Sequence, residues 1–321
     1  MSIDILFDPI AHKYTNRRND PFISVTTLRD LYIDKFSDKE VEIALRCEAI
    51  GKNRMHPKHL KYRYKTATQL LEEWSKESTR ASINGNEKHE YLETEIKIAS
   101  SFKSCSNTTS NRLFTVSDIL ENESIGILDL TVFDNSGVKT LYPQIYTIIE
   151  NFIKAGWRIF SEVCTYHLEL MVSGLIDIIL VKGNKFVILD WKTNKSPVRF
   201  EAGYYDKDNK GNILDVFIYK NSTFKHPLLH LADSIGNKYA MQLSIYAYMT
   251  ELLGFNCEGL ILCHIEPGVY TSNHDKVKSN PLLLGKPVVN IMTMSYLKDE
   301  TTSMFNHYNE NKYKHVAKTL F

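Results

Sequence analysis

The sequence predicts an α/β protein with a mixed central β-sheet flanked by helices and preceded by a mainly helical N-terminal extension. The main observation is a pair of runs rich in Ile, Leu and Val, at 172–181 and 185–191, separated by Lys182-Gly183-Asn184. Such runs joined by a tight-turn signal are typical of a β-hairpin. One helical pattern precedes this hairpin, and a second helical pattern and a buried strand follow it. The sheet must therefore combine antiparallel and parallel neighbours.

The N-terminal part of the chain is expected to consist of short strands followed by helices. The segment from Ser37 to Glu40 has the pattern of a capping box, which predicts a helix from there to about Ile50. The strands are expected at 3–7, 12–15 and 22–25, further helices at 66–78 and 87–99, and a loop at 100–111.

The second half of the chain is expected to contain the centre of the sheet. Pro143 can begin a helix whose apolar residues recur at helical spacing, and Gly156 can end it. The later elements are a strand at 162–170, the hairpin, an inserted hairpin or lid at 199–224, a helix capped near Gly254, and a buried strand at 259–265.

Two carboxylates and one lysine are the candidate chemical groups of the hairpin. Asp177 in the first strand can approach Asp190 near the end of the second, and Lys192 shares a face with Asp190. Neighbouring carboxylates repel each other, so a hard divalent cation, Mg²⁺ or Mn²⁺, is their natural counter-charge. Such a metal can polarise a phosphodiester while the ammonium group positions water or stabilises developing charge.

A simpler interpretation is that both aspartates face solvent at strand ends and that Lys192 is only their ion-pair partner. The position of Asp190 directly after the apolar residues Phe186 to Leu189 favours a functional role, because a carboxylate is disfavoured there unless it has a use.

The two motifs, Gly174 to Asp177 and Asp190 to Lys192, resemble the Gly-x-x-Asp and Asp-x-Lys core of the PD-(D/E)XK nuclease superfamily. This resemblance implies a restriction-endonuclease-like core with the element order αβββαβ. It covers about residues 74–254.

Two further segments resemble the RecB-like branch of this superfamily. The segment 85–93, which includes His89, is similar to the histidine-bearing helix of that branch. The segment 239–246, which includes Gln242 and Tyr246, resembles its Gln-x-x-x-Tyr helix. The motifs occur in the order that the branch predicts, and the closest likeness is to phage nucleases and the mitochondrial genome maintenance exonuclease group.

The resemblance implies a role for each matching residue. It implies metal ligation by His89, Asp177, Asp190 and the Trp191 carbonyl, catalysis by Asp177, Asp190 and Lys192, support from Glu93 and Glu162, and substrate contacts by Thr193, Gln242 and Tyr246. Each helical match has a plainer alternative. His89 would then be a surface residue, and the polar ends of Gln242 and Tyr246 would satisfy buried backbone groups.

A basic and aromatic segment at 51–65 is a second candidate for contact with nucleic acid. Lysine and arginine can contact phosphates while aromatic rings stack on bases, which suits single-stranded DNA. The alternative is a solvated loop balanced by Glu72 and Glu73. The candidate contacts are Lys52, Arg54, Lys58, Lys61, Tyr62, Arg63, Tyr64 and Lys65.

The expected function is hydrolysis of DNA phosphodiesters, with an exonuclease on single strands or DNA ends favoured by the resemblance. The alternatives are a structure-specific endonuclease and a non-catalytic DNA-binding subunit of the same fold. A phosphatase or nucleotide hydrolase is disfavoured, because the chain has no Gly-x-x-x-x-Gly-Lys loop. Replication or recombination proteins are the expected further partners, in DNA replication, recombination or repair.

Composition is compatible with this interpretation. The chain has 321 residues, 43% of them hydrophobic, and a net charge of +1, so affinity for DNA must come from local patches. We expect an N-terminal hairpin and helical section at 1–80, which grips DNA, and a nuclease core at 81–321. Oligomeric state is not predicted by the sequence.

The cysteines and the hydrophobicity pattern indicate a cytoplasmic, intracellular protein, which the resemblance suggests is virus- or phage-encoded. Five scattered cysteines without a Cys-x-x-Cys motif are typical of reduced thiols. Their spacing predicts no iron–sulfur cluster, although several RecB-like relatives carry one. No run of about twenty apolar residues predicts a membrane span. The cysteines are Cys47, Cys105, Cys164, Cys257 and Cys263.

Overall fold

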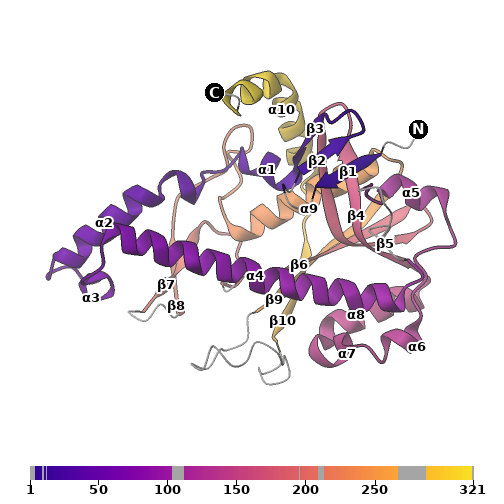
Figure 1. Cartoon of the computed structure of the whole chain (residues 1–321), viewed down its shortest axis with the longest axis horizontal. Helices are drawn as coiled ribbons and strands as arrows, with labels where there is room; N and C mark the ends of the chain where they lie inside the picture. The colour runs from indigo at the N-terminus through magenta and orange to yellow at the C-terminus, as the bar shows by residue number, and fades with distance from the viewer. Residues whose placement is uncertain are drawn as a thin grey trace.

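The computed structural model describes residues 4–8, 11, 13–102, 112–194, 196–208, 213–266 and 287–319. Within these described residues, a mixed sheet of eight strands forms the centre (Figure 1), in the order β1-β2-β3-β5-β6-β9-β10 with β4 paired to β5. Its strands are β1 (Ile5–Asp8), β2 (Lys13–Asn16), β3 (Pro21–Ser24), β4 (Arg158–His167), β5 (Val172–Lys182), β6 (Lys185–Lys192), β9 (Asn256–Ile265) and β10 (Val289–Met294).

Helices cover both faces of this sheet, and one long helix extends beyond it (Figure 1). They are α1 (Val25–Asp30), α2 (Glu40–Lys52), α3 (His59–Tyr62), α4 (Ala67–Ala99), α5 (Val116–Glu121), α6 (Leu130–Phe133), α7 (Gly137–Leu141), α8 (Pro143–Lys154), α9 (Ile235–Glu251) and α10 (Lys298–Thr319). The fold class is therefore the α/β arrangement that the sequence predicts, with α8, β4, β5, β6, α9 and β9 following one another in the expected order.

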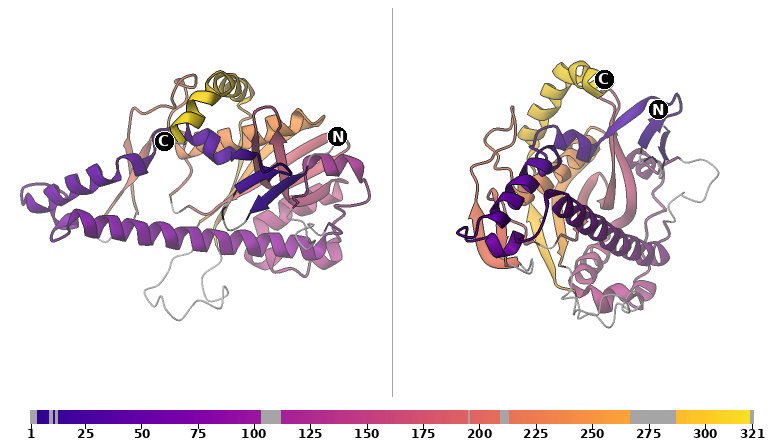
Figure 2. Two further views of the ribbon diagram at one scale, coloured as in Figure 1. Left: turned by 45° about the horizontal axis from the view of Figure 1, so that its top comes forward. Right: turned by 60° about the vertical axis from the view of Figure 1, so that its left-hand side comes forward.

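Two hydrophobic cores lie on opposite faces of the sheet, and Figure 2 shows the two layers of helices from other directions. The first core packs α1, α9 and α10 against alternate residues of the strands, such as Ile179 and Ile188. The second packs the C-terminal part of α4 with α6–α8 against the intervening residues, such as Ile178 and Leu189. This alternation follows from the period of two along a strand.

The β5–β6 hairpin forms as predicted. Lys182 pairs with Lys185 across a turn in which Gly183 has a φ of 59°, a conformation that glycine adopts without steric cost. The strands then pair antiparallel as far as Ile178 and Leu189. Strand β6 also pairs parallel with β9, so the hairpin lies in the interior of the sheet.

The sheet divides beside β5, and this division positions the candidate site. Near its start, β5 pairs in parallel with β3 through Val172 and Ser173, whereas from Ile178 onward the same edge pairs with β6. Residues 174–177 of β5 lie between these two partners. At Gly174 in this stretch, Val25 of α1 and Tyr246 of α9 pack closely against β5.

Helix α4 corrects the prediction of two separate helices at 66–78 and 87–99. It is one helix of 33 residues, and its start is fixed by a capping box between Thr66 and Gln69. Asn84 to Asn86 are weak helix formers, but the helix continues through them, and buried Gly85 lies close to Thr193 there. Tertiary packing overrides local propensity here, and α4 passes through residue 80 without a break.

Two other local predictions are wrong in detail. The expected capping box at Ser37 is absent: Phe36–Asp38 form a 3-10 turn, and α2 begins at Glu40 after Lys39, which makes no side-chain cap hydrogen bond. The strand expected to begin at Glu162 begins at Arg158 instead, so Glu162 lies in the middle of β4. The buried residues Ile159 and Phe160 extend the strand, because each packs into a core.

The insertion predicted near 199–224 is a separate antiparallel hairpin of β7 (Gly203–Lys207) and β8 (Ile213–Tyr219). Residues 209–212 of this insertion and 103–111 of the expected loop at 100–111 lie outside the described residues. Within the described chain, the four cysteines Cys47, Cys164, Cys257 and Cys263 are free thiols. None of the described helices has both the length and the apolar character needed to span a membrane.

Candidate active site

Asp177 and Asp190 face each other where the β5–β6 pairing ends. The last registered pair is Ile178 with Leu189, so the next residue on each strand is an aspartate. Instead of a further backbone bond, the Trp191 amide donates a hydrogen bond to Asp177 Oδ2 at 2.9 Å. The division of the sheet therefore turns the Asp177 side chain toward the end of β6.

Asp190 and Lys192 form a buried ion pair on the α9 side of β6. Lys192 Nζ lies 2.5 Å from Asp190 Oδ2, and the two side chains are 19% and 3% exposed. Despite this proximity, Asp190 Oδ2 makes no hydrogen bond of acceptable geometry with any described residue. The ammonium also lies 5.4 Å from the centre of the Tyr239 ring, in a cation–π contact.

The electrostatics of the two groups differ. Burial, followed by the charge of Asp190, raises the pKa of Asp177 to about 6, although Lys192 and His89 oppose the shift. Burial alone would lower the pKa of Lys192, but the charges of Asp190 and Asp177 outweigh it, so the pKa is raised overall. Lys192 therefore stays protonated, and a cation between the carboxylates would favour ionised Asp177.

Helix α4 brings His89 to the open side of the carboxylates. His89 Nδ1 lies 3.6 Å from Asp177 Oδ2, beyond hydrogen-bond distance but close enough for both to contact one ion. The close approach depends on Gly85, because a Cβ atom there would lie 3.0 Å from Thr193 Oγ1. Thr193 itself follows β6 and lies beside this part of α4.

The two predicted supporting acids meet at a lysine rather than at the aspartates. Glu93 forms an ion pair with Lys97, and Lys97 Nζ lies 3.6 Å from Glu162 Oε2. Glu162 lies at an interruption of the β4–β5 register, between the pairs Ser161–Ile178 and Val163–Ile176, and it has a φ of 51° and a side chain that is 46% exposed. A left-handed residue inside a strand is strained, and here it directs Glu162 toward α4.

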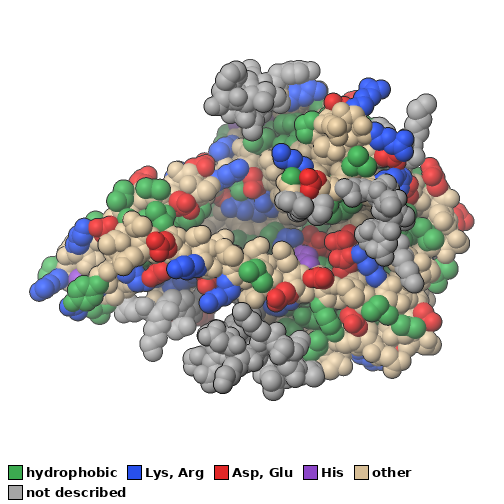
Figure 3. Space-filling view, in the orientation of Figure 1, with side chains coloured by type: hydrophobic (Ala, Val, Ile, Leu, Met, Phe, Trp, Pro, Cys, Tyr) green, Lys and Arg blue, Asp and Glu red, His purple; other side chains and the backbone are tan. Residues whose placement is uncertain are grey.

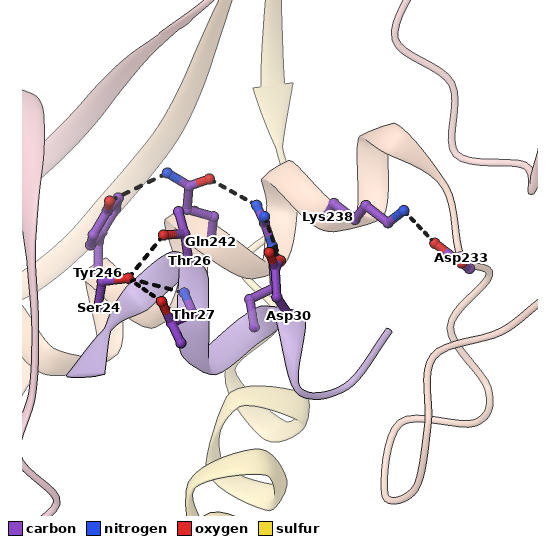
Figure 4. Close-up of polar contacts among 9 residues, drawn as sticks. Ser24, Thr26, Thr27, Asp30, Asp233, Lys238, Gln242 and Tyr246 are labelled. Carbon is purple, nitrogen blue, oxygen red and sulfur yellow. Dashed lines mark hydrogen bonds and ion pairs between the residues drawn. The ribbon is translucent and has the colours of Figure 1, made fainter. Parts of the chain in front are cut away.

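Gln242 and Tyr246 lie one turn apart on α9 and are almost fully buried. The Gln242 amide donates to Tyr246 Oη at 3.3 Å (Figure 4). The ring of Tyr246 packs on Gly174, where a Cβ atom would lie 2.7 Å from Tyr246 Cε1. The glycine of the Gly-x-x-Asp motif is thus explained by close packing of α9 on β5.

The sequence did not single out several residues that surround the site. Arg29 of α1 donates from Nη1 to Gln242 Oε1 at 3.0 Å. Tyr239 donates to Asn194 Oδ1 at 2.9 Å, and buried His264 contacts the Asn194 carbonyl through Nε2 at 2.8 Å. Tyr239 lies one turn before Gln242 on α9, a spacing that could have identified it, whereas the other contacts depend on long-range packing.

The basic segment at 51–65 lies at the outer end of the arm, by which we mean residues 40–84 in α2, α3 and the N-terminal part of α4. Its side chains divide into two sets. Lys58 pairs with Asp206 at 2.9 Å, and Lys61 donates to the Lys207 carbonyl at 3.0 Å, so both hold the β7–β8 hairpin. The other set lines a cavity of about 390 Å³ and comprises Lys52, Arg54, Tyr62, Arg63, Tyr64 and Lys65.

The molecular surface relates these two regions. Figure 3 shows a hollow between α4 and the body of the molecule, with acidic side chains and a histidine in one part of it. Lysine and arginine side chains occur along the arm and at its outer end (Figure 3). Lys52 and Lys65 are paired with Glu48 and Glu73, so part of the basic charge of the arm is neutralised locally.

The donor set of the candidate site fits a hard divalent cation in its chemistry. Two carboxylates lie together, and the Lys192 ammonium is the cation that compensates the buried Asp190 Oδ2 in this structure. Among the described residues, however, no three His, Cys, Asp or Glu side chains form a group that could hold a metal as they stand. Lys192 occupies the position beside Asp190 Oδ2, so metal binding would require this ammonium to move.

Comparisons with known proteins leave the family open. No protein-family model matches the chain, and no curated protein matches its sequence significantly.

Proposed function

We propose that this protein is a metal-dependent deoxyribonuclease of the PD-(D/E)XK type, and that it acts on single-stranded DNA or DNA ends. One observation carries the proposal: Asp177 and Asp190 lie where the pairing of β5 and β6 ends, with Lys192 against Asp190 and His89 Nδ1 3.6 Å from Asp177 Oδ2. A structural ion pair needs only two of these groups. The remaining acid and the histidine match the additional metal ligands that the resemblance to the RecB-like branch implies.

The proposed metal ligands are the side chains of Asp177, Asp190 and His89 and the backbone carbonyl of Trp191. Their oxygen atoms favour Mg²⁺ or Mn²⁺ over softer metals. Such an ion would supply Lewis-acid stabilisation of the phosphate and promote ionisation of water. The raised pKa of Asp177 fits this role, because a carboxylate that resists ionisation alone gains most from a neighbouring cation.

Lys192 would then donate to the attacking water or to the phosphate oxygen that gains charge. Its raised pKa keeps it a donor across the physiological pH range, so it is suited to electrostatic stabilisation rather than to proton abstraction. Gln242 and Tyr246 would contact the scissile strand from α9. Burial and the two aspartates raise the pKa of Tyr246 far above its ordinary value, so its hydroxyl remains a neutral donor.

The arm would provide a second contact for the same strand. The cavity at its outer end combines Arg54 and Arg63 with the exposed ring of Tyr64, which suits a phosphate and a stacked base. Preference for an exonuclease rests on the resemblance to the RecB-like branch and is an analogy. Replication, recombination and repair are the processes that supply such DNA ends, and their proteins are the proposed partners.

The proposal is tested by digestion of end-labelled linear single-stranded and duplex DNA with Mg²⁺, with Mn²⁺ and with chelator. We expect cleavage by the wild-type protein that needs metal and that Lys192→Ala abolishes. A circular single strand is added because it has no end, so its cleavage would indicate the endonuclease instead. If neither protein cuts while both retard single-stranded DNA in a gel, the DNA-binding subunit replaces the nuclease.

A further inference from the structure

Arg29 connects two helices that are distant in the sequence. It lies on α1, its side chain is 13% exposed, and it reaches α9 through the bond from Nη1 to Gln242 Oε1. Its remaining nitrogens are held by Asp30, whose Oδ1 accepts from Nε at 2.8 Å and from Nη2 at 2.6 Å. The charge of Arg29 is therefore compensated, and only Nη1 is directed at α9.

This contact determines which way the Gln242 amide points. With Oε1 accepting from the guanidinium, Nε2 is directed at Tyr246 Oη (Figure 4). The reversed amide would bring its NH₂ donors against the Arg29 donors, which is unfavourable. Arginine therefore selects one of the two amide orientations, and Gln242 becomes the donor in its bond with Tyr246.

The direction of that bond decides what Tyr246 can do. A tyrosine hydroxyl has one hydrogen to donate, and an oxygen that accepts from Gln242 keeps this hydrogen free for another partner. Tyr246 packs on Gly174, three residues before Asp177, at the division of the sheet. Its hydroxyl hydrogen is not used in the bond with Gln242, and the side chain lies close enough to Asp190 and Asp177 for their charges to act on it.

We propose that Arg29 is a positioning residue that, through Gln242, directs the Tyr246 hydroxyl toward the scissile phosphate. This inference rests on the proposed nuclease function and adds a role for a residue outside the recognised motifs. The alternative is that Arg29 only ties α1 to α9. In that case the direction of the amide would not affect the rate of cleavage.

Gln242→Glu separates these two possibilities. A carboxylate still accepts from Arg29 and keeps the tie between the helices, but it cannot donate to Tyr246 and instead attracts its hydroxyl hydrogen. We expect kcat on a labelled single strand to fall about tenfold, as the loss of one hydrogen bond predicts, with KM nearly unchanged. Wild-type kcat in this variant would overturn the inference.

A double-mutant cycle provides the second measurement. Arg29→Met and Tyr246→Phe should each lower kcat about tenfold, and the double variant should be no slower than the slower single variant. Independent roles would give about a hundredfold loss and would contradict the inference. Arg17→Met is the control that should leave kcat unchanged, because the Arg17 side chain is 80% exposed and pairs with Asp4 rather than with a residue of the site.

The outcomes distinguish failure of this inference from failure of the proposed nuclease function. If wild-type protein cuts no strand under any condition, the nuclease proposal and the role of Arg29 both fail. If wild-type protein cuts and Gln242→Glu is equally fast, only the role of Arg29 fails. Thermal unfolding of each variant checks that it folds. If Arg29→Met does not fold, Gln242→Glu still tests the inference.

Discussion

The candidate active site and the contact between the arm and the β7–β8 hairpin each contain an aspartate–lysine pair, and the two pairs differ chiefly in burial. In the site, the side chains of Asp190 and Lys192 are 3% and 19% exposed. In the arm contact, those of Asp206 and Lys58 are 23% and 39% exposed. Water screens the second pair but hardly reaches the first. The same two residue types therefore form a buried ion pair that is hardly screened in one place and a weak surface ion pair in the other.

Helix α4 belongs to both regions and shows how one element can serve two purposes. Its C-terminal part packs Leu92 and Ile96 into a core beside the sheet, which holds His89 in place. Its N-terminal part packs Leu70 against α2 in a much smaller cluster. Less buried apolar surface means lower local stability, so we expect the arm to open more readily than the site.

The largest effect should come from exchanging Asp190 for asparagine, with the same exchange at Asp206 as the comparison. Asp190→Asn removes charge from the buried pair and is expected to lower kcat by about 10²- to 10³-fold, as loss of a preorganised electrostatic group does. Asp206→Asn is the matched control and should change kcat less than about twofold, because its pair is screened. Steady-state cleavage of a labelled single strand measures both. If both variants lost the same factor in kcat, the difference in burial between the two pairs would have no effect on cleavage.

The second prediction concerns stability and pH in the presence of chelator. The folded pKa of Asp177 is about 6, above its ordinary value of 3.8, so the folded state retains a proton that the unfolded state has lost. The free energy of unfolding of the wild-type protein should therefore fall as the pH rises from about 4 to about 6. At pH 8, Asp177→Asn should be more stable than wild type by up to about 3 kcal/mol. Urea unfolding at pH 4 and pH 8 measures this difference.

Asp206 should behave in the opposite way. Hydrogen bonding to Lys58 lowers its pKa, so its contribution to stability is present above the ordinary pKa of an aspartate and is lost on acidification. Asp206→Asn should therefore destabilise the protein slightly at pH 8. A stabilised Asp206→Asn, or an Asp177→Asn variant as pH-dependent as wild type, would contradict the assigned environments.

The third prediction uses the distance between the two regions. His89 lies 22 residues after Ala67, the first residue of α4, so about 33 Å of helix separates the site from the arm cavity. A stacked strand covers this distance in about ten nucleotides, at about 3.4 Å each. Arg54→Ala with Arg63→Ala should weaken binding of a 20-nucleotide strand several-fold and leave a 6-nucleotide strand unaffected.

Binding is measured by fluorescence anisotropy in a Lys192→Ala background, so that no strand is cut. The salt dependence for the long strand should also decrease, by about 0.7 in the logarithmic slope for each phosphate that the arm no longer neutralises. If the affinity for both strands falls equally, the arm residues act on the site itself and the proposed second contact is wrong.

The smallest effect is expected at the contact between the arm and the β7–β8 hairpin. Lys58→Ala should lower the free energy of unfolding by less than about 1 kcal/mol, because both partners are partly exposed. Exchanging the charges with Lys58→Asp and Asp206→Lys should restore most of the stability. A decrease of several kcal/mol would show that this surface pair is as important as the buried one.

Local patterns were sufficient for the hairpin and for the pairing of its acids. Lys182-Gly183-Asn184 determines the turn, and the two-residue period of the strands then brings Asp177 opposite Asp190. Pro143 and Gly156 likewise mark the ends of α8, because proline suits a first turn and Gly156 adopts a φ of 82°. These features depend on neighbours in the chain.

The tertiary structure decided how the other groups reach the acids. Gly85 lets α4 pass close to Thr193, and the division of the sheet exists because β3 and β6 share one edge of β5. The contact between Arg29 and Gln242 joins residues 213 positions apart. Local periodicity and capping patterns cannot predict such a contact, because it depends on packing between elements that are remote in sequence.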